Sequence, residues 1–133
     1  METRKKMEKD FKHPQIFSDL LMFYKRYYPI HAGLPKPFRF TTGESILTEV
    51  THCLKLVTLT NQCDKSDPVS CSKGSDLLGQ LRASIEVIRS YLLVAWQLKL
   101  LSHGGLHELA GVLESVSKQA ARWQQWFRKG GAS

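Results

Sequence analysis

The chain has 133 residues, 42% hydrophobic and 23% charged, with a formal net charge of +7. This composition is typical of one globular domain, and no apolar run approaches the roughly 18 residues that a membrane helix needs. Three cysteines without a Cys-x-x-Cys spacing exclude a disulfide scaffold and favour a reducing compartment, so we expect a cytoplasmic protein without a membrane partner.

The first helix is expected over residues 14–28, after a basic flexible tail over residues 1–13. A proline opens this segment, where its missing N–H costs nothing, and Pro29 is expected to end it. Apolar side chains recur along it at helical spacing: Ile16, Leu20, Tyr24 and Tyr27.

The second helix is expected to begin near Thr41. Thr41 and Glu44 have the spacing of a capping box, in which a hydroxyl and a carboxylate satisfy the first free amides of a helix. A polar loop over residues 64–75 is expected to follow it. The apolar positions are Leu47, Val50, Leu54 and Val57, with Asn61 in the same register, and Ile46 and Cys53 join them.

Two longer helices are expected over residues 75–102 and 106–127, separated and terminated by pairs of glycines. Four amphipathic helices on short connections bury their apolar stripes most simply against each other. The sequence therefore predicts an all-α fold, an antiparallel up-and-down four-helix bundle over residues 14–129, with a short tail at residues 130–133.

Nothing in the sequence indicates an enzyme, a metal or a cofactor. Nucleotide-binding glycine motifs are absent, and His103 and His107 are separated by Gly104-Gly105, which should break the helix that would align them. Cys53 follows His52, but a lone cysteine on an apolar stripe is usually a core residue.

Basic side chains, in contrast, recur at a regular helical spacing. Lys118, Arg122, Gln125 and Lys129 are spaced four, three and four, so one face of the last helix is polar and largely basic. Such side chains can neutralise phosphates, although a solvated face without a ligand is the alternative interpretation. The candidate residues for binding nucleic acid or a partner are Lys25, Arg26, Lys36, Arg39, Arg82, Arg89, Lys118, Arg122, Arg128 and Lys129.

The connector between the first two helices is rich in prolines, cations and aromatics. Its aromatic rings are expected to plug the end of the bundle, and the alternative is that exposed rings stack on bases. The motifs Tyr28-Pro29-Ile30 and LPKPFRFTTGE over residues 34–44 resemble the accessory variability determinant (Avd) proteins of diversity-generating retroelements. The later segment IRSYLLVAWQLKLLS and the closing tryptophans with basic residues are also similar.

This resemblance implies a non-catalytic partner of a reverse transcriptase, in a bacterium or encoded by a phage. Members of the family assemble as a pentameric barrel of four-helix bundles with a positive surface. They bind the reverse transcriptase and template RNA or cDNA, and they support mutagenic retrohoming. The alternatives are a stand-alone RNA-binding bundle, such as a related ribosome-associated family, or an oligomeric scaffold without a nucleic-acid role.

Overall fold

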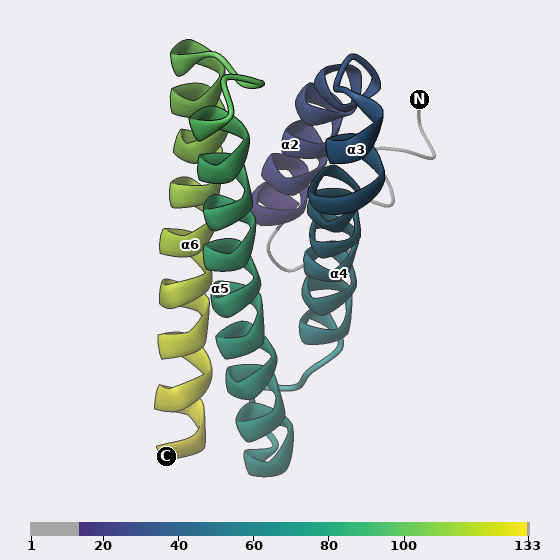
Figure 1. Ribbon diagram of the computed structural model, residues 1–133. Helices are drawn as coiled ribbons and strands as arrows, with labels where there is room; N and C mark the ends of the chain where they lie inside the picture. Colours follow the sequence, from purple (N-terminus) through teal and green to yellow (C-terminus); the bar gives the residue numbers. More distant parts are fainter. Residues whose placement is uncertain (1–13, 133) are drawn as a thin grey trace, which may run out of the picture.

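The structure is a computed structural model that describes residues 14–132, so the predicted N-terminal tail, residues 1–13, lies outside it. Four long helices dominate the described chain: α2 (Pro14–Ala32), α4 (Glu44–Asn61), α5 (Pro68–Gln97) and α6 (His103–Ala132). Consecutive long helices run in opposite directions (Figure 1). The described residues contain no strand, which confirms the prediction of an all-α four-helix bundle.

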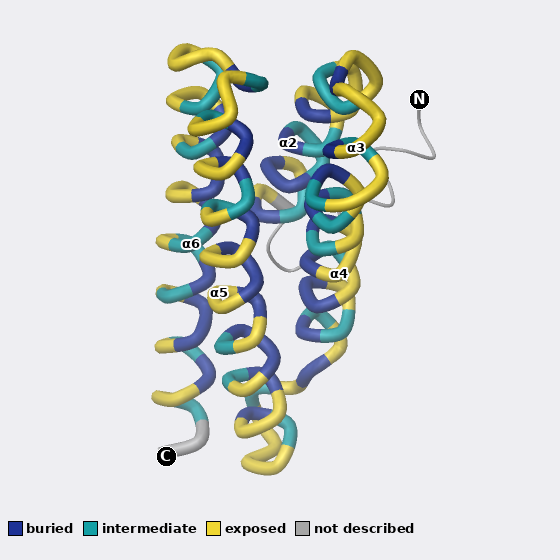
Figure 2. Tube along the Cα trace, in the orientation of Figure 1, coloured by how far each residue is buried: buried dark blue, intermediate teal, exposed yellow. Residues whose placement is uncertain are grey.

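The four helices form a closed square. Helix α4 packs on α5, α5 on α6, α6 on α2 and α2 on α4. Their inward faces carry one continuous hydrophobic core, seen as the buried rows in Figure 2. The largest side chains with almost no exposure include Trp123, Phe127, Phe23 and Tyr27. Burial of these apolar surfaces is what holds four otherwise marginal helices together.

Helix α2 continues through Pro29 to Ala32, so the prediction that Pro29 ends it was wrong. Pro29 is exposed on the outer side of the helix, where water can satisfy the carbonyl that loses its partner. Two residues further on, the helix contributes His31 to the packing at this end of the bundle.

The capping box at Thr41 was also wrong, because the chain is already helical there. A short helical turn, α3 (Lys36–Phe38), leads into a π-helix, η1 (Arg39–Gly43), which continues into α4. The Thr41 hydroxyl instead donates to the carbonyls of Pro37 and Phe38, at 2.5 and 3.3 Å. A π-helical turn of this kind is rare and is often found at functional sites.

Helix α5 begins about two turns before the expected start. Pro68 occupies its first turn, and the Asp67 carboxylate accepts a hydrogen bond from the Val69 amide at 3.3 Å. The predicted loop is therefore partly helical, because Asp67-Pro68 is a complete helix start. The helix ends at Gln97, and Lys99 follows with a φ of 61°.

Helix α6 includes both glycine pairs that were expected to bound it. It begins at His103, with the Ser102 hydroxyl accepting from the Gly105 amide at 2.9 Å, and it continues to Ala132. The segment predicted as a C-terminal tail is thus helical up to residue 132. Glycine is tolerated at these positions because both lie in the terminal turns of a helix that packs along α5.

Candidate nucleic-acid interface

The outer face of α6 carries the predicted polar row. Lys118, Arg122, Gln125 and Lys129 are all exposed along this helix. Lys118 Nζ lies 3.6 Å from Glu114 Oε1, an exposed ion pair that salt would screen. The chain contains no acidic residue after Glu114, so the positive potential increases toward the C-terminal half of α6.

Two of the candidate arginines are engaged by carboxylates. Arg26 of α2 pairs with Glu108 of α6. Arg89 of α5 lies 3.8 Å from both Glu86 on its own helix and Glu114 on α6. These contacts bridge neighbouring helices, so Arg26 and Arg89 contribute to the seams of the bundle and offer less free charge to a ligand.

Arg82 is held by an amide instead of an acid. Its guanidinium donates to Gln124 Oε1 at 3.0 Å, and Gln124 Nε2 donates to the Ser75 carbonyl at 3.0 Å. Gln124 is only 6% exposed, so this chain of hydrogen bonds fixes the seam between α5 and α6. These hydrogen bonds leave Arg82 little freedom to move toward a phosphate.

The cations of the connector lie at the opposite end of the molecule from the C-terminal end of α6 (Figure 1). Lys25 and Lys36 are exposed. Arg39 is half-buried; it donates to the Ala32 carbonyl at 3.3 Å and lies 5.0 Å from the centre of the Phe40 ring. The ten candidate residues are therefore divided between two ends and do not form one surface.

The connector aromatics fall into a buried pair and an exposed pair. Phe38 and Tyr27 are buried, at 6% and 2% exposure, and they close the end of the core. Tyr28 and Phe40 are 55% and 65% exposed. The expected plug thus accounts for only two of these four rings.

Sequence reasoning missed a contribution from the loop between α4 and α5. Lys65 Nζ lies 4.6 Å from the centre of the Trp126 ring, a cation–π contact at the same end as Arg122 and Lys129. Trp126 also packs edge to face on Phe127, at 4.9 Å between ring centres. The Lys65 side chain therefore lies over one face of the Trp126 ring.

Arg128 differs from Arg122 and Lys129 because an acidic residue lies near it. It borders a hollow of about 260 Å³ at the start of α5, and Asp76 lines the same hollow. The nearby carboxylate weakens the electrostatic attraction between Arg128 and an anionic ligand. Among the described residues, Arg122 and Lys129 have no ion pair with a carboxylate, and with Lys118 and Lys65 they define what we call the α6 basic surface.

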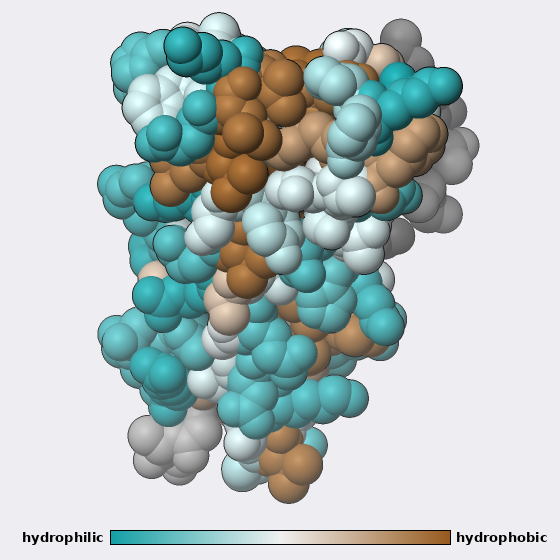
Figure 3. Space-filling model, viewed as in Figure 1, coloured by the Kyte–Doolittle hydropathy of each residue, from teal (hydrophilic) through white to brown (hydrophobic). Residues whose placement is uncertain are grey.

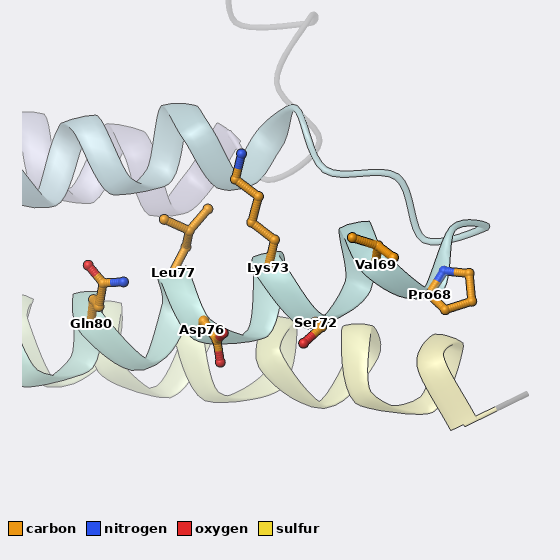
Figure 4. A pocket seen from close by; sticks show the side chains of 7 residues that line it. All are labelled: Pro68, Val69, Ser72, Lys73, Asp76, Leu77 and Gln80. Atoms are coloured by element: carbon orange, nitrogen blue, oxygen red, sulfur yellow. The ribbon is translucent and has the colours of Figure 1, made fainter.

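A larger groove of about 670 Å³ lies along the first half of α5. All seven lining residues belong to this one helix, and the only charged ones, Lys73 and Asp76, point away from each other (Figure 4). A small-molecule site generally needs convergent polar groups from several elements. This open groove therefore lacks the geometry of an active site.

The buried thiol of Cys53 is poorly suited to nucleophilic chemistry. Burial, with a smaller effect of Glu49, raises its pKa from 9.0 to about 12, so the reactive thiolate is disfavoured. The adjacent His52 is exposed, on a different face of α4. Within residues 14–132, no three His, Cys, Asp or Glu side chains gather as metal ligands would.

No helix in the described part of the chain combines the length and the apolar character needed to cross a bilayer. Comparison of the chain with protein-family models, with curated proteins and with solved structures finds no match.

Proposed function

We propose that this chain is a non-catalytic accessory protein of a diversity-generating retroelement. In this role it binds the retroelement reverse transcriptase and template RNA or cDNA, and it supports mutagenic reverse transcription. The proposal includes a homo-oligomer, a pentamer by resemblance, in the cytoplasm of a bacterium. The α6 basic surface is the single observation on which the nucleic-acid part rests.

Three features support this function. The first is the resemblance carried by the connector motif, residues 34–44. The second is the α6 basic surface, whose outer cations Arg122 and Lys129 have no carboxylate partner among the described residues. The third is the four-helix bundle itself, which offers long rigid faces for a large partner.

The nucleic-acid part is tested by titrating a fluorescent RNA hairpin with the protein at two salt concentrations. Binding through phosphates should weaken steeply between about 50 and 200 mM salt, because each contact releases condensed counterions. We expect little dependence on RNA sequence, since no base-reading module is present in the chain. Binding that is absent at low salt, or indifferent to salt, would contradict this part.

The polymerase part is tested by co-purification with the reverse transcriptase of the same genetic element, if the gene has such a neighbour. We expect a complex that survives nuclease treatment, because protein surfaces and not RNA alone would hold it. RNA binding without polymerase binding would instead favour a stand-alone RNA-binding bundle. Light scattering should give about 76 kDa for a pentamer of 15.2 kDa chains.

A further inference from the structure

The tryptophan and phenylalanine rings of α6 differ in burial. Trp123 and Phe127 are 1% and 0% exposed, whereas Trp126 is half-buried. Trp126 follows Arg122 by four residues and precedes Lys129 by three, so it lies between these two cations on one side of the helix. Hydrophilic side chains cover most of the edge of the molecule that α6 forms (Figure 3). The core therefore uses this ring only in part, and cations surround the rest of it.

Lys65 reaches this ring from the loop between α4 and α5. Its Nζ lies 4.6 Å from the centre of the Trp126 ring. Its stem crosses α6 at Gly130, where a Cβ would lie 2.6 Å from Lys65 Cγ and 3.2 Å from the Lys65 carbonyl oxygen. A side chain at this position would collide with Lys65, so the glycine allows the loop to approach the helix. Lys65 thus has a defined position, with its charged end over the ring.

The Lys65 ammonium lies on the ring without an acidic partner. The two acidic side chains of the loop accept from amides of the loop itself: Asp64 from the Ser66 amide at 2.9 Å, and Asp67 from the Val69 amide at 3.3 Å. Lys65 takes part in none of the ion pairs of the described residues. A cation over an aromatic face near the surface is a weak contact. The ammonium can therefore leave the ring without breaking an ion pair.

A nucleic-acid strand offers both kinds of group that this site can accept. Its phosphates attract Lys65, Arg122 and Lys129, and an unpaired base can stack on the Trp126 ring. A stacked base contributes more to binding than an exposed cation–π contact does, so exchange of the ammonium for a base is favourable. The released ammonium is then available to a phosphate. Bases within a duplex are already stacked on each other, so a duplex offers only its phosphates.

We propose that Trp126 is a stacking platform for an unpaired base, and that Lys65 covers this platform until a single strand binds. The inference rests on the proposed function, and it adds that the α6 basic surface prefers single-stranded to fully paired nucleic acid. Every base has an aromatic face, so this preference does not require a particular sequence.

The fluorescence of Trp126 follows the exchange directly. The reporter protein carries Trp96→Phe, which leaves Trp126 and the buried Trp123 as its tryptophans. We expect a uridine oligomer of about ten nucleotides to quench this fluorescence at low salt, because the base stacks on the ring. Inorganic polyphosphate has the charge but no bases, so it should bind with a similar salt dependence and should not quench. Equal quenching by the two ligands would overturn the inference.

Trp126→Leu removes the platform and keeps an apolar side chain against Phe127. Its affinity for the uridine oligomer should fall by about 10-fold, while its affinity for polyphosphate should stay within about 2-fold. Trp96→Leu is the matched control, since that half-buried ring lies against His103 at the opposite end of α6 and should change neither affinity. Equal losses for both ligands in Trp126→Leu, or a loss for neither, would overturn the inference. Trp126→Phe retains a smaller stacking ring, so its loss should be smaller than that of Trp126→Leu.

Lys65→Ala tests the cover. The neutral quencher acrylamide should reach Trp126 more easily in this variant, because the ammonium no longer lies over the ring. The uridine oligomer should still quench Trp126, since the platform itself is intact. Lys73→Ala removes the same charge from an exposed position of α5 and should leave acrylamide quenching unchanged. Equal acrylamide quenching in the wild type and Lys65→Ala would overturn the covering role of Lys65.

Failure of the platform and failure of the proposed function give different results. A wild type that binds both the uridine oligomer and polyphosphate without quenching contradicts the platform and leaves the nucleic-acid function standing. A wild type that binds neither ligand at low salt contradicts the nucleic-acid function, and the platform with it.

Discussion

The Tyr27 hydroxyl donates a hydrogen bond of 3.3 Å to the carbonyl of Gly43, which joins α2 to the end of the π-helix η1. The same hydroxyl lies 3.3 Å from His31 Nδ1, and His31 Nε2 lies 3.9 Å from the Glu44 carboxylate. Burial, with a smaller effect of Glu44, raises the pKa of Tyr27 above its ordinary value. A neutral phenol therefore anchors the connector from inside the bundle.

Replacing Tyr27 with phenylalanine should lower the free energy of unfolding by about 1 kcal/mol, because a buried hydrogen bond is lost while the ring remains. Urea unfolding monitored by circular dichroism measures this difference. The exposed Tyr28→Phe is the control, with an expected change within about 0.5 kcal/mol. Equal effects of the two changes would show that the Tyr27 bond contributes nothing specific.

Replacing Gly74 and Gly111 with alanine should change the stability of the fold in opposite directions. A Cβ at Gly74 would lie 2.8 Å from the Phe127 ring, so Gly74→Ala should destabilise the fold by about 1–3 kcal/mol through overpacking. Gly111 has no neighbouring atom within 4 Å and is exposed inside α6, so Gly111→Ala should stabilise by about 0.5–1 kcal/mol. Thermal unfolding of both variants checks the two signs, and a neutral Gly74→Ala would mean that α5 and α6 pack less closely there.

The Cys53 thiol should make the protein less stable at alkaline pH. Its folded-state pKa of about 12 lies above the ordinary 9.0, so the folded chain keeps a proton that the unfolded chain releases. This contribution is complete below about pH 9 and is lost as the pH rises toward 12. The stability advantage of the wild type over Cys53→Ala should therefore shrink between about pH 9 and pH 12, as measured by urea unfolding.

A constant difference between wild type and Cys53→Ala across that range would contradict this assignment. Other titrating groups, including Tyr27, are present in both proteins and cancel in the comparison.

The α6 basic surface should carry much of the affinity for RNA. Arg122→Gln with Lys129→Gln removes two charges, so the slope of log affinity against log salt should decrease by about 1–2. Lys55→Gln with Lys73→Gln removes the same charge from exposed positions of α4 and α5 and serves as the control. Equal losses for both pairs would indicate that net charge, and not this surface, attracts the RNA.

The helical register of α5 and α6 was predictable because each helix repeats apolar residues at steps of three and four. Leu81, Ile85 and Ile88, spaced four and three along α5, are fully buried, as are Leu113 and Val116 of α6. Among the predicted apolar positions of α4, Ile46 and Cys53 are fully buried, whereas Leu47 and Leu54 are only half-buried. Periodicity shows which side of a helix is apolar. Where the apolar stripe is wide, periodicity does not show which of its positions are the most buried.

Helix ends were predicted less well, because prolines and glycines act differently once a helix is packed. Pro29 and the glycine pair at Gly104 lie inside helices, where tertiary contacts outweigh local preference. The start of α5 at Asp67-Pro68 was visible in the sequence as a cap, but it was assigned to a loop because polar residues surround it.

Composition and periodicity by themselves determined the fold class and the exposure of the α6 row. Only the tertiary structure decided which cations remain free. Arg26 and Arg89 meet glutamates that are distant in the sequence, and Arg82 meets the buried amide of Gln124. Helical spacing reports which residues share a face, whereas the charges across a seam depend on which helices become neighbours.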